Sequence, residues 1–82
     1  MIQKLYSIRD TKANVFNVPF PALTHGEAER TLTDLVRDPK TSISRHPEDY
    51  ELYYLGDFDN VEGQAEFLKI PQSIMSAKNA LA

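Results

Sequence analysis

Residues 24–39 constrain the fold of this chain more than any other segment, because they carry signals for both the start and the end of a helix. Thr24-His25-Gly26-Glu27 has the spacing of a capping box, in which the Thr24 hydroxyl accepts the Glu27 amide and the Glu27 carboxylate reaches back. Apolar residues follow at helical spacing, at positions 28, 32, 35 and 36. Pro39 disfavours helical geometry at the residue before it. The sequence therefore predicts an amphipathic helix over residues 25–38.

Extended segments precede this helix. Residues 3–9 and 14–18 are separated by a turn-prone polar cluster, which predicts an N-terminal β-hairpin. Val18-Pro19-Phe20-Pro21 cannot continue a central ladder, because proline donates no backbone hydrogen bond. We interpret it as a loop or a strand edge. After the helix, residues 40–47 are polar and predict a loop.

The remainder of the chain predicts a second hairpin. Residues 50–58 alternate and are rich in aromatics, as a strand is, and residues 65–70 can return as the partner strand after an acidic turn. Beyond Pro71 we expect either a short C-terminal helix or, over residues 72–82, a loosely ordered tail. The expected fold class is α+β, with two hairpins around one central helix in a single domain over residues 1–82.

The charge of the chain is unevenly distributed. Nine basic and twelve acidic side chains give a net charge of −3, and an acidic surplus argues against a strong non-specific hold on nucleic acid. Residues 1–45 hold seven of the basic and five of the acidic side chains, whereas residues 46–82 hold two and seven. The resulting balances of +2 and −5 allow the chain to orient on a polyanion, or to pair head to tail with a second copy.

Several classes of protein are disfavoured by what the sequence lacks. It has no cysteine, which excludes disulfides and thiolate metal sites. No apolar run approaches the roughly 20 residues of a membrane span. The first ten residues lack the apolar core of a secretory signal. We therefore expect a cytoplasmic protein that does not enter a membrane.

Signatures of catalysis and metal binding are also missing. His25 and His46 have no partner at ligand spacing. The acidic turn fails the calcium-loop pattern, since its fifth, sixth and twelfth positions hold Val61, Glu62 and Leu68. The three glycines are too scattered for a phosphate loop. We expect a non-enzymatic protein with no catalytic residues, no cofactor and no bound metal.

The first hairpin instead combines aromatic side chains with cations, as surfaces that bind single-stranded nucleic acid do. The candidate binding residues are Lys4, Tyr6, Arg9, Lys12, Phe16 and Arg45, with Tyr53 as an extension. Strand alternation puts Lys4 and Tyr6 on one face, which Arg9 must reach from the strand end. The alternative is that Tyr6 and Phe16 are core residues, because so short a chain needs its large apolar residues inside.

Three blocks of sequence stand in a characteristic order: residues 6–20, which begin Tyr6-Ser7-Ile8-Arg9-Asp10, residues 24–30, and residues 47–59. In this order and spacing they resemble the small nonstructural proteins of gokushoviruses, tailless phages of the Microviridae with single-stranded DNA genomes. The resemblance covers about residues 1–63. It implies a DNA-binding phage protein of the bacterial host cytoplasm that acts when replication turns to single-strand synthesis and packaging. It identifies no binding residues.

Two hypotheses of function follow. In the first, the chain binds the single-stranded viral genome, as a homo-oligomer that doubles a weak basic surface, and assists replication or packaging. In the second, it is a protein-interaction module that contacts a viral or host replication or assembly protein through its acidic C-terminal half. The acidic hairpin between Glu48 and Glu62 would then make the contact.

Overall fold

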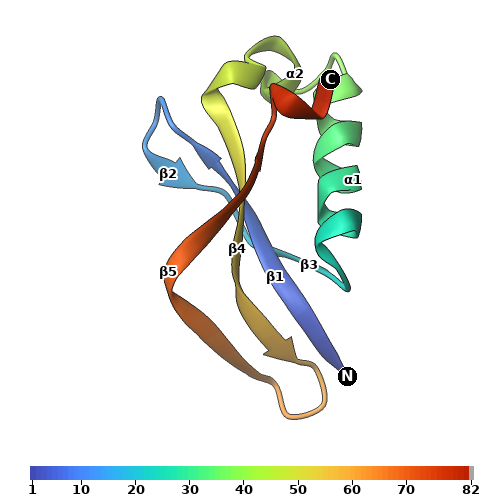
Figure 1. Cartoon of the computed structure of the whole chain (residues 1–82), viewed down its shortest axis with the longest axis vertical. Coiled ribbons are helices and arrows are strands. Elements are labelled where there is room, and N and C mark those ends of the chain that lie inside the picture. The colour runs from blue at the N-terminus through green and yellow to red at the C-terminus, as the bar shows by residue number, and fades with distance from the viewer. Residues whose placement is uncertain (82) are drawn as a thin grey trace.

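The computed structural model describes residues 1–81 and is mostly β-structure with one long helix (Figure 1). The strands are β1 (Ile2–Asp10), β2 (Val15–Phe16), β3 (Phe20–Ala22), β4 (Tyr50–Asp59) and β5 (Gln64–Ser76). The helices are α1 (His25–Arg37) and the one-turn α2 (Ser42–Arg45), and 3-10 turns occupy Pro47–Asp49 and Asn79–Leu81. Among these described residues, no helix is both long enough and apolar enough to span a membrane.

The five strands form one antiparallel sheet in the order β2-β1-β4-β5. The short strands β2 and β3 share the outer edge of β1, where β2 pairs with Arg9 and Asp10 and β3 pairs with residues 4–6. Strands β4 and β5 form a long hairpin, which leaves β5 as the other edge of the sheet. The alternation of each strand therefore sorts its side chains onto two faces.

Helix α1 forms where the capping box predicts it. The Thr24 Oγ1 accepts a hydrogen bond from the Glu27 amide at 3.1 Å, and the helix ends at Arg37, two residues before Pro39. Its buried residues Ala28, Leu32 and Val36 form the apolar stripe that the spacing indicates. They pack on one face of the sheet, with a core completed by Tyr6, Ile8, Ala22, Ile43, Leu52, Ala77 and Ala80.

The helix is too short to cover the sheet. Its 13 residues span about 20 Å, whereas the longest axis of the molecule measures 38 Å. Figure 1 shows α1 beside the upper half of the sheet and the β4–β5 hairpin extending below it. We call residues 56–70 the arm. All of residues 60–70 are exposed.

The structure resolves one alternative that the sequence left open and corrects two expectations. The segment around Phe20 takes the strand-edge form as β3, because its free carbonyls and remaining amides pair along β1. The polar stretch 40–47 contains α2, which begins because the Thr41 hydroxyl accepts from the Ser44 amide and which buries Ile43. The N-terminal hairpin is shorter than expected, since β2 has only two residues.

The C-terminal segment differs most. The helix expected from Pro71 is replaced by strand β5, which continues to Ser76 and is followed, within the described residues, by a 3-10 turn. Pro71 is compatible with a strand here because it lies on an edge, in a stretch that skips pairing between Phe67 and Gln72. Beyond it, Ile74 and Met75 pack against the core and Ala77 is buried.

Candidate nucleic-acid interface

The face of the sheet turned away from α1 carries the candidate interface, and we call it the open face. In β1, Tyr6 and Ile8 point into the core, so Ser7 and Arg9 point to the open face. The register of β1 against β4 places Tyr53 opposite Ser7 and Glu51 opposite Arg9. The register of β1 against β2 adds Phe16 opposite Arg9, so side chains from three strands meet on this face.

A tight turn between β1 and β2 positions the basic side chains. The Asp10 carboxylate accepts from the Lys12 amide at 3.0 Å and from the Ala13 amide at 3.1 Å. Asn14 adopts a left-handed conformation with φ of 60°, which asparagine tolerates well. Its side-chain oxygen accepts from the Arg9 guanidinium. The turn thus fixes Arg9 and holds Lys12 in solvent.

Arg9, Phe16 and Tyr53 form a cation–aromatic cluster on the open face. The Arg9 guanidinium lies 5.0 Å from the centroid of the Phe16 ring, within range of a cation–π interaction. The Phe16 and Tyr53 rings meet edge to face with centroids 5.3 Å apart. Phe16 remains 39% exposed. The cluster therefore offers solvent both an aromatic ring and a cation, the two elements that hold a base and a phosphate.

Tyr6, predicted as a binding residue, is a core residue instead. It has no exposed surface, and its ring lies 6.0 Å from that of Phe20 and 5.5 Å from that of Tyr54. Its hydroxyl forms a 2.5 Å hydrogen bond with His25 Nδ1. Burial, and then nearby carboxylates, raises the pKa of Tyr6. No base can stack on this ring, and the alternative that the sequence left open is correct for Tyr6.

Lys4 lies on the same helix-side face as Tyr6, away from the cluster. Its ammonium sits 5.6 Å from the centroid of the Tyr54 ring, and its backbone pairs with Asp57. The Tyr54 hydroxyl donates to Asp57 Oδ1 at 2.6 Å, which, together with desolvation, raises the pKa of Tyr54 to about 12. Lys4 is therefore held among acidic and aromatic groups. Arg45 is exposed on a separate element, at the end of α2.

The structure thus retains part of the predicted site. It brings together Arg9 and Phe16, with Lys12 in the adjoining turn, and adds Tyr53 as a full member. It also adds Glu51, which is opposite Arg9 on the neighbouring strand β4. The Glu51 carboxylate accepts a hydrogen bond from the Ser73 hydroxyl. The aromatic alternation of residues 50–58 points to Tyr53, but only the register between β1 and β4 places it and Glu51 beside Arg9.

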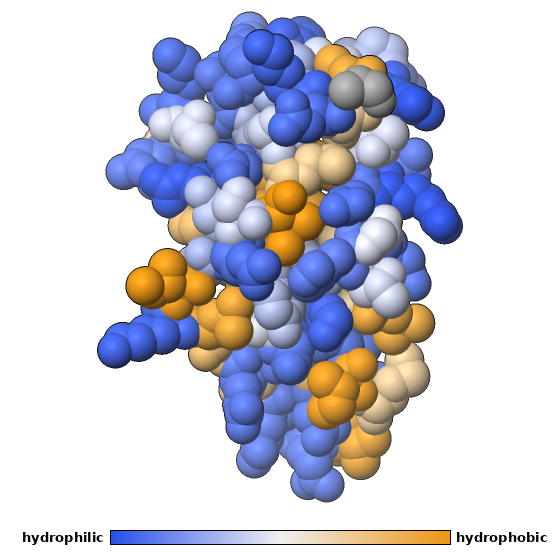
Figure 2. Space-filling model, viewed as in Figure 1, coloured by the Kyte–Doolittle hydropathy of each residue, from blue (hydrophilic) through white to orange (hydrophobic). Residues whose placement is uncertain are grey.

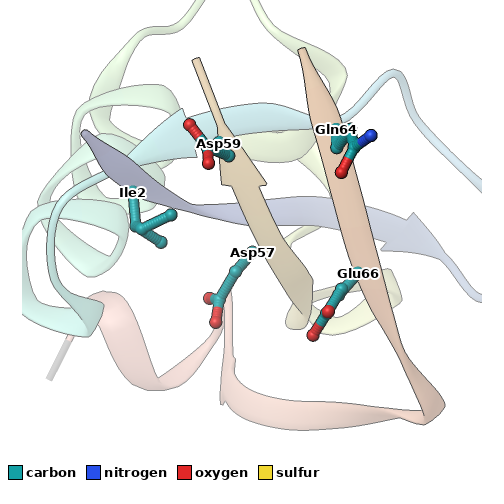
Figure 3. A pocket seen from close by; sticks show the side chains of 5 residues that line it. All are labelled: Ile2, Asp57, Asp59, Gln64 and Glu66. Atoms are coloured by element: carbon teal, nitrogen blue, oxygen red, sulfur yellow. The ribbon is translucent and has the colours of Figure 1, made fainter. Parts of the chain in front are cut away.

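A concave site lies on the opposite face of the sheet, in the arm. Asp57, Asp59 and Glu66, with Ile2 and Gln64, line a hollow of about 250 Å³ (Figure 3). The Asp59 carboxylate accepts from the Val61 and Glu62 amides, and these hydrogen bonds lower its pKa. The hollow is therefore strongly negative and unsuited to phosphate.

One group of metal-ligating type precedes β4. His46, Glu48 and Asp49 bring potential ligand atoms within 4.8 Å of one another. Sequence reasoning missed this proximity because the 3-10 turn Pro47–Asp49 folds the carboxylates back toward the imidazole. His46 and Glu48 are exposed, and such groups are common on surfaces without an ion. We assign no metal to it.

Comparison with known proteins identifies the family of this chain. The family model described as "Phage ORF5 protein" matches residues 3–80. The chain belongs to the phage ORF5 family. It is 34% identical over 79 residues to "Protein ORF5" of Chlamydia phage 1, an alignment that covers 92% of this chain and 80% of that protein. Chlamydia phage 1 is a gokushovirus of the Microviridae, so the resemblance to gokushovirus small proteins is confirmed. No solved structure matches the ORF5-family chain.

Proposed function

We propose that this phage protein binds single-stranded DNA through the Arg9–Phe16–Tyr53 cluster. The single observation that supports the proposal is the Arg9 guanidinium 5.0 Å from a Phe16 ring that stays partly exposed, with the Tyr53 ring against it. Aromatic rings of this kind stack on any base, which suits binding without sequence readout. The affiliation with phages whose genomes are single-stranded DNA supports the same ligand.

The number of cations on this surface sets its affinity for DNA. Arg9 and Lys12 are the cations of the first hairpin on or beside the open face, so we expect about two phosphate contacts per protomer. Single strands lose about 0.7 in the logarithm of affinity per contact for each tenfold rise in salt, which gives a slope of about −1.4. Binding is therefore weak for one protomer and strongest at low ionic strength.

Fluorescence anisotropy with a labelled oligothymidine at low and moderate salt tests the proposal. Phe16→Ala removes a stacking contact, which is typically worth about 1–3 kcal/mol per base, and should weaken binding roughly 5- to 150-fold. Arg9→Gln should weaken binding and make the salt slope shallower by about 0.7. Arg30→Gln, an equal charge change on exposed α1, is the matched control and should have little effect. Absence of wild-type binding at low salt would overturn the proposal.

Glu51 supplies a test with the opposite sign. Glu51 on β4 is the register partner of Arg9 on β1, and its negative charge repels a phosphate that approaches the cluster. Glu51→Gln should therefore strengthen binding, because glutamine keeps an acceptor for the Ser73 hydroxyl while it removes the charge. An unchanged affinity in Glu51→Gln would mean that DNA does not approach this face.

In the infected bacterium, we propose that this non-enzymatic activity assists replication or packaging of the viral genome in the host cytoplasm. In phage that carry Phe16→Ala, the ratio of single-stranded to duplex viral DNA should fall during infection. An unchanged ratio together with lost binding in vitro would separate the biochemical activity from this role.

The acidic hollow in the arm favours a second candidate function, contact with a viral or host replication or assembly protein. Three carboxylates converge there, on the face opposite the cluster. The triple variant Asp57→Asn, Asp59→Asn, Glu66→Gln keeps the hydrogen-bond acceptors and removes the charge. Under this second function it should abolish phage growth and leave DNA affinity intact or improved. Normal growth of the triple variant would eliminate the second function.

A further inference from the structure

The chain exposes more surface than a compact protein of its size. Its accessible surface is 5354 Å², whereas a folded monomer of this mass typically exposes about 5,000 Å². Its radius of gyration is 12.7 Å, against about 11.7 Å for a compact domain of this length. The excess is explained by the arm, which α1 does not cover. Figure 2 shows apolar surface at the bend of β5 and over the lower half of the molecule.

The arm has two chemically different faces. On the helix side, pairing of β4 with β5 aligns Asp57 with Glu66 and Asp59 with Gln64, which makes the acidic hollow. On the open side it aligns Phe58 with Ala65 and places Phe67 and Leu5 on either side of Gly56. Phe67 is 63% exposed. The open side of the arm is thus mainly apolar, with Gln3 opposite Phe58 as its polar member, and helix α1 does not cover it.

The distribution of charge indicates what can cover this face. Nucleic acid is disfavoured, because four carboxylates and one cation lie in the arm: Asp57, Asp59, Glu62, Glu66 and Lys69. A second copy of the same face fits, since carboxylates paired across the hairpin point away from the apolar side. Two such faces can stack, about 10 Å apart, while their acidic hollows face outward.

We infer that two copies of this chain associate through the open faces of their arms, with Phe67 and Phe58 of each against the other. The two-fold symmetry makes the contact isologous and closed, so it yields a dimer and no filament. This inference does not depend on DNA binding.

The size of the face sets the strength of the dimer. Three strands about 4.8 Å apart and six residues long present a patch of the order of 300 Å². A standard stable interface buries about 800 Å² on each partner. We therefore expect a reversible dimer that forms at micromolar or higher concentration.

Sedimentation equilibrium of the full chain over a wide concentration range tests this inference. The wild-type mass should rise from that of the monomer toward twice that value. Phe67→Thr, which keeps β-propensity at an exposed position, and Ala65→Lys, which puts a charge into the patch, should both remain monomeric. Val18→Thr is the matched control, because it removes apolar surface that is 87% exposed but lies outside the arm, and it should dimerise as the wild type does.

Three results would overturn the inference: a wild-type mass that stays monomeric at the highest concentration, variants that dimerise normally, or a mass that rises beyond the dimer. Far-UV circular dichroism establishes that each variant is folded. Anisotropy with oligothymidine completes the test, and the monomeric variants should retain the affinity per protomer of the wild-type monomer. Lost DNA affinity with unchanged mass would assign the patch to nucleic acid, and absent DNA binding with intact dimerisation would overturn only the proposed function.

Discussion

The covered half of the sheet and the arm are built from the same strands, yet they are different environments. In the covered half, Tyr6 and Leu52 face α1 and are fully buried. In the arm, a register shift of β4 between Tyr54 and Gly56 reverses the alternation, which puts Asp57 on the helix-side face and Phe58 on the open face, and neither is fully buried. The apolar side of the sheet therefore changes from one face to the other between the two regions.

This difference shows that alternation alone does not define a core. A sheet face is buried only where another element lies on it, and α1 ends before the arm begins (Figure 1). Beside the helix, the face turned away from α1 carries the cation–aromatic cluster. Beyond the helix, the apolar face is left in solvent. One sheet thus presents two chemically different surfaces.

The largest expected effect is a loss of stability in the covered half. Leu32 has no exposed surface, and Leu32→Ala should lower the free energy of unfolding by about 3 kcal/mol, because it leaves a cavity between helix and sheet. The matched substitution Leu68→Ala, in the arm and 39% exposed, should cost less than about 1 kcal/mol. Urea unfolding measures both. Equal losses would show that the arm contributes as much to the fold as the core does.

The next largest effect is expected at Gly56, where the covered half meets the arm. Gly56 has φ of 155°, and a Cβ there would lie 2.1 Å from the Glu66 carbonyl oxygen. Gly56→Ala should therefore cost about 2 kcal/mol and release β5 from β4 within the arm. Gly63, at the hairpin tip, has open space around it, so Gly63→Ala should cost only about 1 kcal/mol for its left-handed backbone. Hydrogen exchange of the arm amides, with urea unfolding, distinguishes the two.

Alkaline pH tests the contribution of Tyr54, which lies at the boundary between the covered half and the arm. The hydrogen bond from Tyr54 to Asp57 raises the pKa of the phenol from 10.0 to about 12. The folded state therefore favours the neutral phenol, so this contribution is complete below pH 10 and is lost as pH rises toward 12. Urea midpoints should fall across this window, and the fall should be shallower in Tyr54→Phe. An identical pH profile in that variant would exclude the Tyr54 hydrogen bond as a cause.

The smallest effect is confined to the hairpin tip. Amide hydrogen bonds lower the pKa of Asp59, so its stabilising contribution is present above the ordinary value of 3.8 and is lost as pH falls below it. Asp59→Ala should speed hydrogen exchange at Val61 and Glu62 at neutral pH and leave the core amides unchanged. Asp59→Asn, which keeps the acceptor, is the control. Equal exchange in the alanine variant and the wild type would show that the turn holds without this side chain.

Much of the fold was predictable because its signals are local. The capping box and Pro39 lie within one stretch of chain and define α1 to within one residue at its C-terminal end. The alternation of residues 50–58 likewise predicts β4. The terminal segment was not predictable in this way, since Pro71 is compatible locally with the start of a helix but lies within an edge strand when β4 is beside it.

The candidate site divides along the same line. The residue types of the candidate site were predictable from local sequence: the cations and aromatics of the first hairpin, and the acidic surplus of the second half. Three contacts were not predictable: Phe16 meets both Arg9 and Tyr53, Tyr6 is buried, and Glu51 is the register partner of Arg9. The physical reason is that side chains on one strand alternate by local geometry, whereas strand register and the reach of α1 depend on contacts between residues far apart in the chain.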